Sequence, residues 1–67
     1  MTDRVFENER SFEVSQRGDD VEVYVFDDGD VNVTVKIDAG WDSQHASFTM
    51  TAEEATMLKE FLIRKGY

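Results

Sequence analysis

Residues 21–37 read VEVYVFDDGDVNVTVKI, and this stretch decides the fold. Valine occupies every second position on each side of an acidic turn that contains Gly29. Such alternation is typical of strands, because successive side chains of a strand point to opposite faces of a sheet. The stretch therefore predicts a β-hairpin.

The length of the turn determines which residues of the hairpin share a face. With a two-residue loop at 28–29, Val25 would lie opposite Asn32, and valines would mix with polar residues. With a three-residue loop at 27–29, Gly29 supplies the left-handed residue of a G1 bulge. We expect the three-residue loop, because a slip of one residue would move an apolar set to the wrong side of the sheet.

This register predicts two chemically different faces. One face, here called the valine face, carries Val21, Val23, Val25, Val31, Val33 and Val35. The opposite face, here called the polar face, carries Glu22, Tyr24, Phe26, Asn32, Thr34 and Lys36.

The size of the chain limits how it can be stabilised. A chain of 67 residues has room for one domain and buries only about 60% of its unfolded surface. There is no cysteine, so neither a disulfide nor a thiolate zinc site is available, and packing or self-association must suffice. No apolar run approaches the ~20 residues of a membrane span, and residues 1–4 lack the features of a signal peptide. We expect a cytoplasmic protein without a membrane partner.

Charge is the strongest compositional signal. Fifteen acids against seven bases give a net charge of −8, and residues 18–30 contain six acids and no base. Residues 51–67, in contrast, contain three of each sign. An acidic field repels phosphate backbones and attracts basic surfaces, so we expect a larger protein with a basic surface as partner and no direct nucleic-acid binding. The alternative is that the acids only keep a small protein soluble.

The segments around the hairpin predict further strands. Residues 1–10 are mostly polar and suggest a loosely held arm or a short edge strand. Residues 11–15 alternate and predict a strand. A two-residue loop at 18–19, or a four-residue loop centred on 17–18, would place Phe12 and Val14 on the valine face. Residues 38–43 suggest a turn-rich connection before another alternating strand at 44–50. Short connections favour an antiparallel meander.

The C-terminal segment predicts a helix from Ala52 to about Lys65. Thr51-Ala52-Glu53-Glu54 matches the capping box, in which the first and last side chains bond to each other's backbone amides. Gly66 is well placed to end the helix. The inner stripe consists of Ala55, Leu58 and Leu62 and is widened by Met57 and Phe61. We expect this stripe to lie across Phe12, Val14, Val23, Val33 and Phe48.

The expected fold class is therefore α+β. It combines a small antiparallel β-meander of three to four strands with one C-terminal α-helix packed across one sheet face. Residues 1–10 would form an arm or edge strand, and residues 11–67 a single ββββα domain.

A partner-binding surface is predicted on the polar face. Tyr24 and Phe26 lie there beside Glu22, and exposed aromatics among polar neighbours are typical of interfaces. The acids of the turn, Asp27, Asp28 and Asp30, would steer a basic partner. Alternatively, Val5, Phe6 or Trp41 folds over the aromatic pair. Trp41 could cap the core, the commoner fate, or stand exposed as a binding anchor.

The sequence contains few candidates for catalytic or metal-binding residues. His45 is the single histidine, and alternation places it with Ser47 on the polar face, away from any pocket. The run from Asp28 resembles the start of a calcium loop, but Val33 and Ala39 stand where an EF-hand needs Gly and Glu. We therefore expect no enzyme, no catalytic residues, no cofactor and no metal site.

Two kinds of function remain. The first is a non-catalytic acidic protein-binding module that docks on a basic site of a larger protein, with a small accessory subunit as a variant of this idea. In size, acidity and lack of cysteine, the chain resembles small phage-encoded inhibitors, including anti-CRISPR proteins and uracil-DNA glycosylase inhibitors, which implies a host nucleic-acid enzyme as target. No motif matches residue by residue, so no site is carried over. The alternative is a homo-oligomeric module, for example a homodimer, that pairs through its exposed sheet face.

Overall fold

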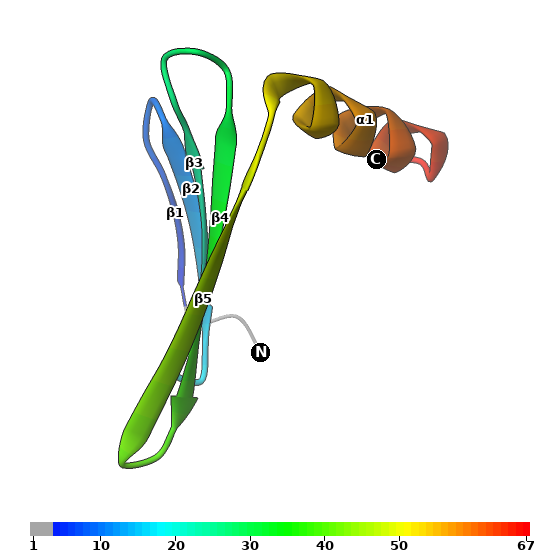
Figure 1. Cartoon of the computed structure of the whole chain (residues 1–67). Coiled ribbons are helices and arrows are strands. Elements are labelled where there is room, and N and C mark those ends of the chain that lie inside the picture. Colours follow the sequence, from blue (N-terminus) through cyan, green and yellow to red (C-terminus); the bar gives the residue numbers. More distant parts are fainter. Residues whose placement is uncertain (1–3) are drawn as a thin grey trace.

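The computed structural model describes residues 4–67, apart from the side chain of Ala39. These residues form one antiparallel sheet of five strands in the order β1-β2-β3-β4-β5, followed by one helix (Figure 1). The elements are β1 (Arg4–Glu7), β2 (Ser11–Gln16), β3 (Asp19–Val25), β4 (Val31–Ala39), β5 (Asp42–Met50) and α1 (Ala52–Arg64). The α+β class and the antiparallel meander are confirmed. The sheet has one strand more than the upper limit predicted, because part of the N-terminal segment forms an edge strand, β1.

The central hairpin has the predicted register. Val25 lies opposite Val31, and Val23 lies opposite Val33. The Phe26 amide donates to the Asp30 carbonyl at 2.8 Å, which leaves three residues in the loop, and Gly29 has a φ of 93°. A type I turn followed by a left-handed glycine needs this geometry, so the three-residue loop is confirmed.

The β2–β3 and β4–β5 hairpins have two-residue loops. Arg17 and Gly18 both have positive φ, 52° and 85°, as a type I′ turn requires. The loop is centred on 17–18, as one of the two predictions placed it, but it is two residues long rather than four, because Gln16 and Asp19 still pair. Gly40 and Trp41 connect β4 to β5. The expected turn-rich connection over 38–43 is wrong, because a positive φ of 83° at Gly40 allows the strands to pair almost to the tip.

The outer strands extend the valine face. Val14 lies opposite both Val5 of β1 and Val21 of β3, while Phe48 of β5 lies opposite Val33. The predicted placement of Phe12 and Val14 on the valine face is confirmed. The apolar side chains of one sheet face thus form a continuous layer from β1 to β5.

The helix begins and ends as the sequence indicates. The Glu54 amide donates to Thr51 Oγ1 at 3.2 Å, and the Thr51 amide donates to Glu54 Oε1 at 2.9 Å, so the capping box is complete. At the other end, the Tyr67 amide donates to the Leu62 carbonyl, and Gly66, with a φ of 98°, donates to the Ile63 carbonyl. These two bonds make a Schellman motif, which satisfies carbonyls that the end of a helix leaves without partners.

The predicted position of the helix is wrong. Instead of lying across the valine face, α1 leaves the end of β5 and extends away from the sheet (Figure 1). Leu58 remains 44% exposed, and no side chain of α1 is buried. The reason is the connection: Thr51 alone joins β5 to α1, whereas helices that fold back on a sheet usually follow loops of about two to three residues.

The described part of a single chain therefore has no closed core. Within the part that the structure describes, no side chain is buried, and the most protected residues of the valine face, such as Val23 and Val33, are half-buried. The valine face and the helix stripe are both open in one molecule.

Candidate protein-binding surface

Two aromatic rings lie on the polar face beside the β3–β4 turn. Tyr24 belongs to β3, and Phe26 follows that strand directly. Their ring centroids lie 5.1 Å apart at an interplanar angle of 64°, an edge-to-face arrangement that favours both rings. Tyr24 is 37% exposed and Phe26 41% exposed, so the pair remains accessible to a partner.

Neighbouring polar side chains hold one another in place. Thr34 Oγ1 donates to Asn32 Oδ1 at 2.9 Å, and Asn32 Nδ2 donates to Thr49 Oγ1 at 3.0 Å. This chain of hydrogen bonds crosses from β4 to β5. These bonds hold the side chains of three residues of the polar face in place.

Glu22 lies opposite a second carboxylate on this face. Its register partners are Glu13 on β2 and Thr34 on β4. Like charges directly opposite each other on a sheet are destabilising. Arg4 of β1 forms an ion pair and a hydrogen bond with Glu13, which offsets part of this repulsion. Glu22 is exposed and adds a carboxylate beside the aromatic pair.

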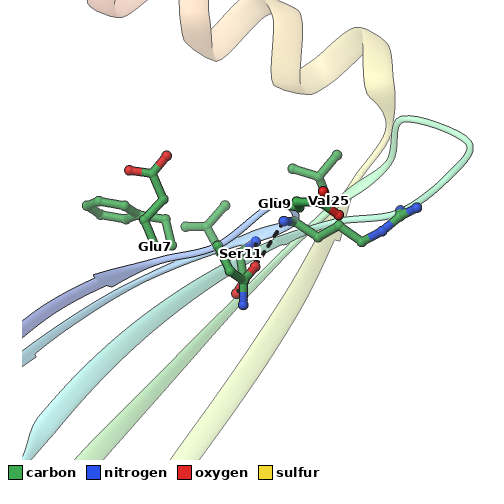
Figure 2. Close-up of a pocket in the computed structure, with 8 residues that line it drawn as sticks. Glu7, Glu9, Ser11 and Val25 are labelled. Atoms are coloured by element: carbon green, nitrogen blue, oxygen red, sulfur yellow. Dashed lines mark hydrogen bonds between the residues drawn. The ribbon is translucent and has the colours of Figure 1, made fainter.

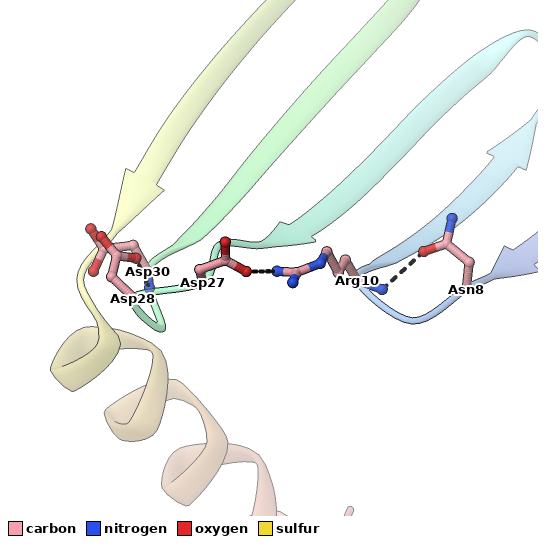
Figure 3. Close-up of polar contacts among 5 residues, drawn as sticks. All are labelled: Asn8, Arg10, Asp27, Asp28 and Asp30. Carbon is pink, nitrogen blue, oxygen red and sulfur yellow. Dashed lines mark hydrogen bonds and ion pairs between the residues drawn. The ribbon is translucent and has the colours of Figure 1, made fainter.

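The three acids of the turn have different structural roles (Figure 3). Asp27 forms an ion pair with Arg10 of the β1–β2 loop, and Asp28 Oδ1 accepts a hydrogen bond of 2.9 Å from the Asp30 amide. Asp30 Oδ1 accepts one of 3.2 Å from the Ala52 amide in the first turn of α1. The sequence predicted only steering for these acids. Their turn chemistry is a known property of aspartate, whose side chain often bonds to the backbone two residues on.

Trp41 lies far from the aromatic pair. It occupies the tip of the β4–β5 turn, at the end of the sheet opposite to the β3–β4 turn (Figure 1). Trp41 is 100% exposed, so the favoured prediction that it caps the core is wrong. A two-residue hairpin loop projects its side chains beyond the sheet, and the alternating stretch contains no signal for this. Trp41 therefore does not belong to the same surface as Tyr24 and Phe26.

Acidic residues gather at both ends of the sheet. One end carries the turn acids Asp27, Asp28 and Asp30, while the other carries Asp19, Asp20, Asp38 and Asp42. At the second end, the Asp38 amide donates to Asp19 Oδ1 at 2.9 Å, which ties β4 to the start of β3. The charge therefore forms two clusters with the polar face between them.

A groove lies on the valine face, and the sequence did not predict it (Figure 2). It has a volume of about 260 Å³ and is lined by Glu7, Asn8, Glu9, Arg10, Ser11, Phe12, Val23 and Val25. Asn8 Oδ1 accepts hydrogen bonds from the Arg10 and Ser11 amides at 2.9 and 2.8 Å, which fixes the loop at one end of the groove. Glu7 and Val25 point to the side of the sheet on which the helix lies. The asparagine at the turn was the available signal, but the sequence analysis predicted only an arm or a short edge strand for residues 1–10 and no turn that could line a groove.

The remaining side chains show little convergence for chemistry. His45 lies opposite Lys36 on the polar face and is exposed. Among residues 4–67, no three His, Cys, Asp or Glu side chains are grouped so as to hold a metal ion. The described chain also has no helix that is long and apolar enough to cross a membrane.

No protein-family model matches this chain, and neither a curated protein sequence nor a solved structure was found that matches it. Its function is therefore inferred from its own residues and surfaces.

Proposed function

We propose that the chain is a non-catalytic binding module that docks on a basic surface of a larger protein. The observation that carries this proposal is the placement of charge: residues 1–50 contain twelve acids and four bases, whereas residues 51–67 are balanced. A field of one sign over the sheet attracts surfaces of the opposite sign and accelerates their association. The turn acids and Glu22 provide this field next to the aromatic pair.

Tyr24 and Phe26 are the proposed anchors of the interface. Interfaces are often held by a few aromatic residues at their centre, with polar groups around them. The two rings contact each other, and the hydrogen-bonded chain of Thr34, Asn32 and Thr49 fixes the neighbouring side chains. Such a surface loses little side-chain freedom on binding, which favours affinity.

The negative charge supports a partner with a basic surface. We infer a cytoplasmic nucleic-acid enzyme whose basic site the acidic chain blocks, in the manner of a phage-encoded inhibitor. The two separate acidic clusters favour ordinary protein docking over imitation of a continuous phosphate backbone. In this proposal, Trp41 is a second contact at the far end of the sheet and not part of the central anchor.

The proposal is tested by capture from a bacterial lysate on the immobilised chain. A specific partner should be retained at low salt, weaken with salt as Debye screening increases, and be lost with the double variant Tyr24→Ala and Phe26→Ala. Ser47→Ala, on the same face but outside the hydrogen-bonded chain, is the matched control and should retain the partner. Equal capture by the double variant, with circular dichroism showing an intact sheet, would contradict the aromatic anchor.

A homo-oligomeric module is the second candidate function. The specific observation that favours it is that no side chain is buried in the part of one chain that the structure describes. Light scattering at low and high salt tests this candidate. A dimer that tightens with salt would support it, because apolar pairing then works against mutual acidic repulsion, whereas a monomer under both conditions would exclude it.

A further inference from the structure

We propose that two copies of the chain form a dimer in which α1 of each copy packs across the valine face of the other. This arrangement rests on the homo-oligomeric candidate function and specifies its interface. It names a second copy of this chain as the occupant of both open apolar surfaces.

Each chain carries two complementary surfaces that it does not use. The valine face is an apolar layer across five strands, and none of its described side chains is buried. The helix stripe repeats at Ala55, Leu58 and Leu62, the spacing of one helical face, and Leu58 and Leu62 are exposed. A helix with such a stripe normally gains its stability by packing it against another element.

The structure keeps each helix away from its own sheet. Thr51 alone links β5 to α1, and the capping box fixes the first turn on this residue. The Ala52 amide also donates a hydrogen bond to Asp30 Oδ1. Gly29 lies so close to the start of α1 that a Cβ on it would be 3.1 Å from the Ala52 side chain. Rotating α1 onto its own valine face would break these contacts. A second chain is not subject to this constraint.

The exposed area matches what a permanent dimer would bury. The chain exposes 5560 Å². A folded monomer of 7.7 kDa is expected to expose about 4,300 Å². The excess is roughly 1,200 Å² per chain and about 2,400 Å² for two chains, which falls within the range of obligate homodimers.

Charge favours helix-on-sheet contact over sheet-on-sheet contact. Residues 51–67 carry three acids and three bases, whereas residues 4–50 carry eleven acids and four bases, so the C-terminal segment adds no net side-chain charge. Stacking two valine faces directly would bring two sheets with the full negative charge together. Placing this segment on each sheet brings apolar surface to it without adding net negative charge, and the groove beside Phe12 and Val25 leaves room for a large side chain.

Cysteine cross-linking tests this arrangement, because the native chain contains no cysteine. A tagged chain with Val33→Cys is refolded together with an untagged chain with Leu58→Cys and treated with a bismaleimide. We expect a cross-linked product that contains one tagged and one untagged chain. The matched control replaces Val33→Cys by Thr34→Cys, which moves the thiol to the other face of the same strand and should give several-fold less product.

Each outcome has a defined meaning. Strong cross-linking of the Val33 and Leu58 variants, but not of the control, supports the dimer in which each α1 packs across the valine face of the other chain, here called helix exchange. A chain that carries both substitutions and becomes cross-linked within itself would show that α1 folds onto its own sheet, which overturns the proposal. Absent or face-independent cross-linking also overturns it. If light scattering then still shows a dimer, the homo-oligomeric function survives while this interface fails.

Discussion

The two faces of the sheet differ in whether they are complete. On the polar face, side chains contact each other: the rings of Tyr24 and Phe26 meet, and Thr34 bonds to Asn32. On the valine face, the side chains form an apolar layer that no element of the same described chain covers. Strand alternation produced both faces from the same residues 21–37. The difference teaches that one sheet can combine a face whose side chains contact one another with a face whose apolar side chains lack a covering element.

The largest effect on stability should come from placing a charge on the valine face. Phe48→Asp adds a carboxylate to the valine face, although Phe48 is 64% exposed in one chain. If a second copy covers this position, the variant leaves an unpaired charge in the interface and should lose about 3–5 kcal/mol of unfolding free energy. Chemical denaturation monitored by circular dichroism measures this loss.

Ser47→Asp is the matched control for this change. Ser47 precedes Phe48 on β5 and lies on the polar face opposite Thr34. We expect it to change stability by at most about 0.5 kcal/mol, as an ordinary surface substitution does. Equal effects of the two substitutions would show that the valine face remains open in solution.

Truncating the helix stripe should have the next largest effect. Leu58→Ala should cost about 2–5 kcal/mol if the stripe is buried in a dimer. In an isolated chain, where Leu58 is 44% exposed, the same change should cost far less. Lys59→Ala, at the next position of α1, is the control. Urea midpoints at two protein concentrations distinguish the cases, because the stability of a dimer depends on concentration.

The smallest effect concerns the polar face. Glu22→Gln removes the repulsion between Glu22 and Glu13, which lie directly opposite each other. We expect a gain of about 0.2–1 kcal/mol, the usual range for cross-strand pairs, with no change in oligomeric state. Urea denaturation at low ionic strength checks this gain, and a loss of stability would mean that the Glu22 carboxylate makes a stabilising contact.

Local chemistry made much of this molecule predictable. Valine alternation with Gly29 gave the register of β3 and β4, and the residues Thr51, Glu54 and Gly66 marked both ends of the helix. Each of these features depends on residues that are close together in sequence. The same register also predicted the two faces of the sheet, and with them the placement of Tyr24, Phe26 and Glu22 on the polar face.

The position of the helix was not predictable in this way. Its amphipathic stripe indicates that it packs on something, but the stripe does not say in which molecule. That depends on the length of the connection at Thr51 and on the hydrogen bond that the Ala52 amide donates to Asp30, 22 positions away in the sequence. Trp41 was misjudged for a related reason, since the extent of strand pairing up to Asp42 decides whether it reaches the core.

The Asp30 bond to the first turn of α1 also has a consequence for the life of the protein in a cell. It sets the helix at a fixed angle, so a lone copy exposes both apolar surfaces at once. Under helix exchange, folding and meeting a second copy would be one event, and newly made chains would stay vulnerable to proteases until enough had accumulated. The amount of active protein would then rise steeply with the rate of synthesis rather than in proportion to it.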